Sequence, residues 1–264
     1  MQIEPKNVKH SQPEVAIMGL RVYAGNMATA VADVAAQIER RESAAYVCVR
    51  DVHGVMAAQR HPQLKAIHNQ AFMTVPDGVP LMWLGRRAGA AGMGRVFGPD
   101  LMLEVCRAGV EPGWTHYLYG GKTGVPELLK TRLEERFPNI KIVGTCSPPF
   151  RPLNQEEEAA LEAELREKKP DCFWVGLGTP KQEEFMGRYA ERLDTRVMFG
   201  VGAAFDIHTG FMRDAPNWMK RAGLQWLHRL WQEPRRLWRR YLINNTHFIW
   251  YWLTRKGRAR LLDR

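Results

Sequence analysis

Cysteine is scarce in this sequence. Only four cysteines occur among 264 residues, and they are dispersed at Cys48, Cys106, Cys146 and Cys172. No two of them form a C-x-x-C pair, and no histidine stands at a zinc-ligand spacing from them. The pattern argues against a disulfide framework or a zinc site, and it fits a reducing cytoplasm.

Long apolar runs are also missing. A helix that crosses a bilayer needs about 20 consecutive apolar residues, whereas the longest aromatic run here covers only 248–253. Residues 1–14 are polar and lack the apolar stretch that a signal peptide requires. We therefore expect 1–14 to be a polar tail, and we expect that the protein does not span a membrane.

Three signatures of nucleotide sites are absent. No D-x-D pair occurs, which argues against the Mn²⁺-carboxylate site of many nucleotide-sugar enzymes. The glycines at 176–178 lack the third glycine of a dinucleotide fingerprint, and 120–123 would need a glycine where His116 stands to be a Walker motif. The 120–123 segment stays a candidate for lining a nucleotide pocket. We expect no metal and no cofactor, so that Arg, Lys and backbone amides would neutralise a leaving group.

Positive charge is concentrated at one end of the chain. Residues 211–264 carry 13 Lys and Arg against three acidic residues, whereas the first 210 residues carry 25 of each kind. The same last fifth of the chain holds six of the nine tryptophans. The sequence thus joins an electrically neutral body to a basic, aromatic C-terminal segment.

Hydrophobic periodicity predicts strands that alternate with helices. Strands are expected at 15–22 (a strand or hairpin arm), 45–49, 71–75, 115–119, 140–143, 172–175 and 196–201. Helices are expected at 28–40, 62–69, 100–108 with Asp100 as N-cap, 125–137, 155–168 and from 180 onward. This order is typical of an α/β fold with a Rossmann-like parallel sheet. We expect a core over 15–210 that includes a smaller N-terminal subdomain, and a helical, cationic appendage over 211–264.

Ligands of such sheets bind outside the carboxyl ends of the strands, and several polar residues follow predicted strands. Asp77, in the Asp-Gly turn after 71–75, is either a plain turn residue or a rigidly placed carboxylate that could serve as a general base. Asp51 and His53 follow 45–49 and could form an acid–base or ligand pair, although a lone histidine is more often structural. Asp206 is similarly placed after 196–201.

The loop 176–183 is the sharpest local signal. Its glycines let the backbone approach a ligand, Pro180 suits the first position of a helix, and free amides at the helix start could hold a diphosphate beside Lys181. The alternative is a capping box in which Thr179 is the N-cap and Gln182 stands at the third helical position.

The C-terminal segment is predicted to be an amphipathic helix. At about 100° per residue, arginines fall on one side and the following residues share the other: Leu227, Leu230, Trp231, Leu237, Trp238 and Tyr241. Pro234 either kinks this helix or starts a second one. A basic face beside a Trp-rich face fits the surface of an anionic membrane, and the alternative is an ordinary helix packed on the core.

These pieces together resemble the WecG/TagA/CpsF glycosyltransferases (glycosyltransferase family 26) over about residues 15–245. The segments that carry the resemblance, in their order and spacing, are 76–78 (PDG), 95 with 98–100 (R…GPD), 119–121 (YGG), 175–183 (VGLGTPKQE), 200–206 (GVGAAFD), 213 with 215–216 (R…AP), 223–230 (GLQWLHRL) and 233–236 (EPRR).

The resemblance implies a hexosyltransferase that moves a sugar from a UDP-sugar to a polyprenyl-diphosphate-linked saccharide, with inversion and without a required metal. The sugar would be a hexose, a uronate or of the N-acetylmannosamine type, and the product would serve cell-surface polysaccharide synthesis. The enzyme would lie at the cytoplasmic, inner face of the membrane, on its anionic surface. No nucleic-acid partner is expected, and association into a homo-oligomer stays open.

The resemblance also assigns roles to residues of this chain. Asp77 would be the base that deprotonates the acceptor hydroxyl. The donor pocket would include Asp51, Arg95, Gly120, Gly178, Lys181, Gln182 and Asp206. Arginines of the appendage would close over the site and contact diphosphate at the membrane, namely Arg229, Arg236 and Arg239.

The chain departs from the family pattern at two positions. The family commonly has Thr-x-Asn where this chain has Val49, Arg50 and Asp51, and an ionised Asp51 cannot donate a side-chain hydrogen bond to a sugar. Gln225 stands where Glu is usual. The identity of the donor sugar is therefore not carried over.

Two other classes of function remain as alternatives. A non-catalytic module could dock on anionic lipid or nucleic acid through the basic segment, in which case Asp77→Ala would change nothing measurable. A nicotinamide-dependent oxidoreductase is disfavoured by the missing glycine, and calorimetry with NAD(P) would test it.

Overall fold

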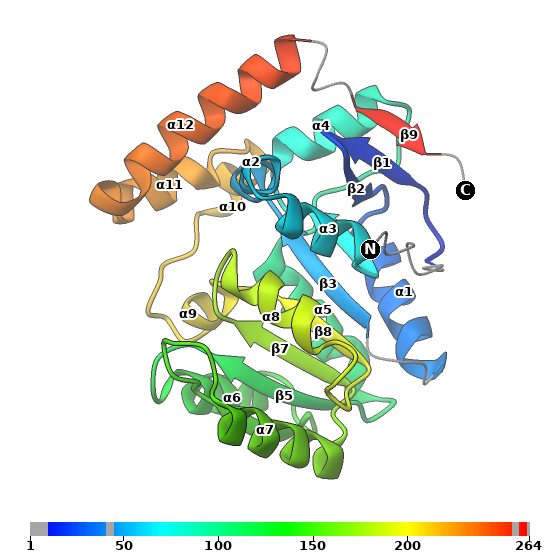
Figure 1. Ribbon diagram of the computed structural model, residues 1–264, viewed down its shortest axis with the longest axis vertical. Coiled ribbons are helices and arrows are strands. Elements are labelled where there is room, and N and C mark those ends of the chain that lie inside the picture. Colours follow the sequence, from blue (N-terminus) through cyan, green and yellow to red (C-terminus); the bar gives the residue numbers. More distant parts are fainter. Residues whose placement is uncertain (1–9, 41–44, 255–258, 263–264) are drawn as a thin grey trace.

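The computed structural model describes residues 10–40, 45–254 and 259–262. Its centre is a six-stranded sheet in which every neighbouring pair is parallel (Figure 1). The strands in spatial order are β4 (Met73–Pro76), β3 (Ala45–Arg50), β8 (Val197–Gly200), β7 (Cys172–Gly176), β5 (Thr115–Gly120) and β6 (Lys141–Cys146). The α/β class and the parallel sheet predicted from the sequence are confirmed.

Helices cover both faces of this sheet. Because successive strand residues point to opposite faces, Trp174 of β7 packs with α1 (Met27–Arg40), α5 (Gly98–Val110) and α6 (Val125–Arg136), whereas its neighbour Phe173 packs on the other side. The helices of that second side are α7 (Gln155–Lys168) and α8 (Lys181–Tyr189), with α3 (Pro62–Gln70) beside them. Both faces are therefore buried, as is usual for parallel sheets.

The predicted start of α5 needs correction. The helix begins at Gly98 and its N-cap is Phe97, so Asp100 lies inside the first turn. Its carboxylate there faces the positive end of the helix dipole, which is favourable without a capping hydrogen bond.

A small antiparallel sheet lies beside the parallel one. β1 (Glu14–Ile17) and β2 (Leu20–Tyr23) form a hairpin whose two turn residues, Met18 and Gly19, both have positive φ. This is the geometry of a tight two-residue turn. Two helices that the sequence did not predict, α2 (Val52–Arg60) and α4 (Val79–Arg87), share an apolar cluster with the hairpin.

The C-terminal segment contains several elements. After α9 (Ala204–His208) come α10 (Asn217–Arg221), α11 (Gln225–Gln232), α12 (Pro234–Leu253) and finally strand β9 (Arg260–Leu262), which pairs with β1. The segment expected to be a helical appendage therefore returns to the N-terminal hairpin (Figure 1). None of the helices that the structure describes is long and apolar enough to cross a bilayer.

Pro234 starts a second helix, so the single amphipathic face expected across 227–241 does not form. Leu237 and Tyr241 are buried, whereas Leu227, Trp231 and Trp238 are exposed. α12 packs on α2, where the Asn244 side chain bonds His53 and Arg60 at 2.8 and 3.0 Å. Pro234 lacks the amide that would continue α11, which explains the break.

One buried ion pair links the strand β3 to the helix α8. Arg50 and Glu183 are 1% and 0% exposed and bond each other, and Arg50 Nη1 also donates to the Thr179 hydroxyl at 3.2 Å. Burial raises the pKa of Glu183, and the Arg50 charge opposes that effect. Removal of one partner would leave the other charge buried and unpaired.

We predict that Glu183→Leu lowers the free energy of unfolding by about 3–5 kcal/mol, the range for breaking a buried pair from one side. The double variant Arg50→Met with Glu183→Leu should recover part of this loss, because no charge is then stranded. Urea unfolding of both variants measures the difference. A double variant that is no more stable than the single one would contradict the interpretation.

Candidate active site

A large cleft opens at the carboxyl ends of the parallel strands. Its volume is about 1760 Å³, and α11 and α12 form its far wall. Nine of the predicted site residues line it, namely Asp51, Asp77, Arg95, Gly178, Lys181, Gln182, Asp206, Arg229 and Arg236. Two do not: Gly120 packs directly on the backbone of Gly176, and Arg239 is exposed beside the Trp238 ring.

Asp77 is fixed at the end of β4 by backbone bonds to the neighbouring strand. The amides of Asp77 and Gly78 donate to the carbonyl of Arg50 at 2.8 and 3.3 Å. The Arg95 guanidinium holds the other side, since its Nη2 donates to Asp77 Oδ1 at 3.0 Å and its Nε donates to the Asp77 carbonyl. The carboxylate therefore has one orientation, and it is 24% exposed toward the cleft.

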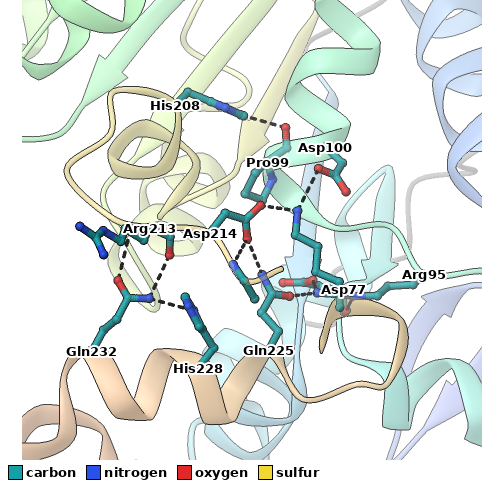
Figure 2. A network of polar contacts seen from close by, with 12 residues as sticks. Asp77, Arg95, Pro99, Asp100, His208, Arg213, Asp214, Gln225, His228 and Gln232 are labelled. Atoms are coloured by element: carbon teal, nitrogen blue, oxygen red, sulfur yellow. Dashed lines mark hydrogen bonds and ion pairs between the residues drawn. The ribbon is translucent and has the colours of Figure 1, made fainter. Parts of the chain in front are cut away.

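Arg95 connects Asp77 to the C-terminal helices, as Figure 2 shows. Its Nη2 also donates to Gln225 Oε1 at the start of α11. Gln225 Nε2 donates in turn to Asp214 Oδ1 at 3.3 Å, and Asp214 forms an ion pair with Lys220. The placement of α11 and the orientation of the Asp77 carboxylate thus depend on one guanidinium.

Several opposing influences set the pKa of Asp77. Burial is the largest and raises the pKa, Arg95 lowers it, and the nearby Asp51 carboxylate raises it again, so that the net result is above the ordinary value. A carboxylate with a raised pKa is a stronger base, which suits removal of a proton from a hydroxyl.

The loop after β7 supplies the opposite wall. Gly178 has φ +76°, a conformation that side-chain-bearing residues rarely adopt, and no atom stands where a Cβ would be. Gln182 Nε2 donates to the Gly200 carbonyl at 3.0 Å, while its buried Oε1 has no hydrogen-bond partner among the described residues. Lys181 reaches the Phe150 carbonyl at 3.4 Å from the rim.

The predicted start of α8 is wrong in two respects. Pro180 is the N-cap rather than the first helical residue, and the hydroxyl of Thr179 accepts a bond from Arg50 instead of capping the helix. The amides of residues 182–184 already donate to the carbonyls of Gly178 and Pro180. The helix start therefore has fewer free amides for a diphosphate than the sequence suggested.

Asp51 and His53 are held by other groups. Asp51 Oδ1 caps α2 by accepting the Gly54 amide at 2.8 Å, and its Oδ2 lies 4.0 Å from Arg240 Nη2. Burial and the Arg240 charge lower the pKa of His53 to about 4, so the imidazole is neutral near pH 7 and can accept from Asn244. These bonds favour the structural interpretation of His53.

Cations gather on the appendage side of the cleft. Arg229, Arg236 and Arg240 line the cleft from this side, and Lys122 lines it from the loop between β5 and α6. The charges of Lys122, Arg236 and Arg229 act on the Asp206 carboxylate. The buried Nε atoms of Arg229 and Arg240 have no hydrogen-bond partner within the part of the chain that the structure describes. Burial raises the pKa of Asp206, and Lys122 is the largest influence that opposes it.

Sequence reasoning missed Arg240 and the wall formed by α4. Arg240 belongs to the basic side of the predicted C-terminal helix. The packing of Asn244 against α2 orients α12 so that the Arg240 side chain lies near Asp51. Trp83 carried no signal, because α4 was not predicted. The 120–123 segment, kept as a pocket candidate, does line the cleft through residues 121–123.

Comparison with known proteins identifies the family of this chain. The model of the glycosyl transferase WecG/TagA/CpsF family matches residues 15–261. The chain belongs to this family. The resemblance drawn from the sequence motifs is confirmed, and Asp77, Arg95, Gln182 and Asp206 all lie in the matched region.

Two similar proteins are named N-acetylglucosaminyldiphosphoundecaprenol N-acetyl-beta-D-mannosaminyltransferase. The one from Bacillus subtilis (strain 168) is 29% identical over 168 residues, which cover 64% of this chain and 63% of the relative. The one from Bacillus spizizenii (strain ATCC 23059 / NRRL B-14472 / W23) is 27% identical over 185 residues, 70% of each chain. The match thus spans less than two thirds of the first relative's length.

We predict that Arg95→Gln raises the pKa of Asp77 further, because it removes the charge that most strongly favours the ionised carboxylate. Carbon NMR titration of the aspartate carboxyls would measure the shift. Arg107→Gln, at an exposed arginine paired with Glu104, is the control and should leave that titration unchanged. An Asp77 pKa that stays the same or falls in Arg95→Gln would contradict the assignment.

Proposed function

We propose that this protein is an inverting, metal-independent glycosyltransferase that moves a sugar from a UDP-sugar to a polyprenyl-diphosphate-linked saccharide. One observation carries the proposal: the Asp77 carboxylate, fixed by Arg95, shares a cleft with Gly178 and Gln182 on one side and with appendage arginines on the other. Family membership and the names of the two Bacillus relatives support the same class of reaction.

In the proposed step, Asp77 takes the proton of an acceptor hydroxyl. The hydroxyl oxygen attacks the anomeric carbon of the donor sugar from the face opposite the nucleotide. The new C–O bond forms as the bond from the anomeric carbon to the diphosphate oxygen breaks, and UDP departs with that electron pair. A single displacement of this kind inverts the anomeric centre, and the proton remains on Asp77 until solvent removes it.

Side chains rather than a metal ion would neutralise the departing diphosphate. Lys122 and Arg236 line the cleft near Asp206, and guanidinium groups bind phosphate oxygens in a bidentate manner. No group of three His, Cys, Asp or Glu side chains suitable for a metal occurs among the described residues. Fixed cations in a cleft with restricted water can supply the required stabilisation.

The acceptor would reach this site from the membrane surface. The relatives' names specify an acceptor built on diphosphoundecaprenol. In this chain, α11 and α12 expose a set of large apolar side chains: Trp226, Leu227, Trp231, Trp238, Leu242, Ile243, Ile249, Trp250, Trp252 and Leu253. Together with the basic residues between them, this surface fits the interfacial zone of an anionic cytoplasmic leaflet.

We predict that Asp77→Asn lowers the turnover number by about 10²-fold or more while UDP still binds, because general-base catalysis contributes about 10²- to 10⁴-fold. UDP release from a panel of UDP-sugars with a lipid-diphosphate acceptor measures turnover, and calorimetry measures UDP binding. Asp194→Asn, an exposed carboxylate paired with Lys169, is the control. Near-normal turnover in Asp77→Asn would remove this residue from the chemistry and favour a binding module.

Membrane association is testable without truncation, which would remove packed elements. The double variant Leu242→Ser with Ile243→Ser should reduce partitioning onto anionic liposomes by at least about tenfold, since each buried aliphatic side chain contributes about 1.5–3 kcal/mol. Thr246→Ser, on the same side of α12, is the matched control. Equal flotation of all three proteins would contradict a membrane role for this face.

A further inference from the structure

The cleft continues beyond Asp77 into a channel between α4 and α12. On α4, the residues that line it are spaced by three or four positions: Pro80, Trp83, Leu84 and Arg87. On α12, the lining residues repeat in the same way: Leu237, Tyr241, Asn245, Phe248, Ile249 and Trp252. Side chains at this spacing share one face of a helix. Each helix therefore presents a continuous face to the same channel.

This channel is apolar along most of its length. Its floor is formed by Leu84 and Phe248, which are buried in the cluster that joins α2, α4 and the hairpin. Its rim carries Trp83, Ile249 and Trp252, which are 61%, 52% and 47% exposed. Large apolar side chains left open along a groove mark a site for an apolar ligand.

The chemistry of the lining changes in a definite order. Asp77 lies just after β4, and the charge of Arg229 reaches it. Arg240 on α12 has its Nη2 4.0 Å from Asp51, the residue that follows the neighbouring strand β3. The buried Nε atoms of Arg229 and Arg240 lack partners among the described residues. From Arg240, α12 then runs outward for about 18 Å to Trp252, at about 1.5 Å per residue.

The groove face of α12 differs from the side that carries Ile243 and Trp250, while Ile249 and Trp252 at the groove's rim also belong to the exposed apolar set of α11 and α12. At about 100° per residue, Tyr241, Asn245 and Trp252 point in one direction, and Ile249 lies about 60° from their mean direction. Ile243 and Trp250 point roughly half a turn away from that mean direction. Asn244, on the remaining side, holds α12 to α2. The helix thus has separate sides for the core, the cleft and the outer surface.

We propose that the groove between α4 and α12 binds the first isoprenoid units of the acceptor lipid. This rests on the proposed function, and it assigns a direction to the substrate: saccharide at Asp77, diphosphate at Arg229 and Arg240, and hydrocarbon along Trp83, Ile249 and Trp252. The order of carboxylate, cations and apolar wall matches the order of hydroxyl, diphosphate and polyprenyl chain in one molecule. A UDP-sugar has no hydrocarbon part that could occupy the apolar end.

The decisive experiment compares two acceptors that share the saccharide diphosphate but carry either a polyprenyl chain or a methyl group. In detergent, the wild-type protein should use the polyprenyl acceptor with the higher kcat/KM. Trp83→Ser with Ile249→Ser should reduce that advantage by at least about tenfold through KM, because two apolar contacts are lost. Use of the methyl acceptor should stay within a factor of two or so.

The outward pair Ile243→Ser with Trp250→Ser is the matched control, because both side chains are exposed and neither lines the cleft. It should keep the ratio between the two acceptors. If the outward pair reduces the ratio as strongly as the groove pair, the preference for the polyprenyl acceptor arises from association of the protein with detergent micelles. The proposal is then wrong. Equal losses with both acceptors in the groove pair would also overturn it, because they would show a general defect.

A binding measurement separates this proposal from the proposed reaction. Polyprenyl diphosphate without any saccharide should quench the tryptophan fluorescence of the wild-type protein and bind at least about tenfold more weakly to the groove pair. Binding of this kind without any sugar transfer would refute the transferase function, and the proposal that the groove binds the lipid would still hold. Sugar transfer without binding that depends on the polyprenyl chain would refute only the lipid-binding role of the groove.

Discussion

The arrangement of this protein depends on the bonds that one guanidinium makes. Arg95 bonds the side chain and the backbone carbonyl of Asp77, and it also bonds Gln225 at the start of α11. Asp77, which follows strand β4, and Gln225, which begins α11 in the C-terminal segment, are thereby both held by the Arg95 guanidinium. Because the arginine is planar and presents several donors in a fixed geometry, it fixes both partners at once.

The rest of the site follows from the ends of neighbouring strands. Parallel strands bring their carboxyl ends to one edge, so Asp51, Asp77 and the loop at Gly178 meet although they are far apart in the sequence. The buried Arg50–Glu183 pair then ties the end of β3 to the first turn of α8. The walls of the cleft are therefore joined by buried charge as well as by the sheet.

Much of this architecture could be predicted from the sequence, because strong periodicity and glycine breaks marked the parallel strands and most flanking helices. α2 and α4 escaped detection since their apolar residues pack against the hairpin and α12, contacts that no local pattern reports. The start of α8 was misplaced for a similar reason: the Thr179 hydroxyl is taken by Arg50, more than a hundred residues away in the chain.

The same limit applies to the site. The residue type at the end of a predicted strand made Asp77 a candidate, and that position is set by the fold class. Gln182, in the first turn of α8, was assigned to the donor pocket through the family resemblance. Arg240 could not be distinguished from Arg239 on a basic helix, because the choice depends on how Asn244 seats α12 against α2. Local pattern thus found the residues that the sheet places, and it missed those that depend on packing between distant segments.

The pairing of β9 with β1 has a mechanical consequence for α10, α11 and α12. Their segment leaves the sheet after α9 and is anchored again at the N-terminal hairpin, so it is attached at both ends, as a strap is (Figure 1). A strap of this kind can flex between its anchors but cannot swing away as a hinged door does. Movement of α11 and α12 relative to the sheet is therefore limited at both ends of the segment.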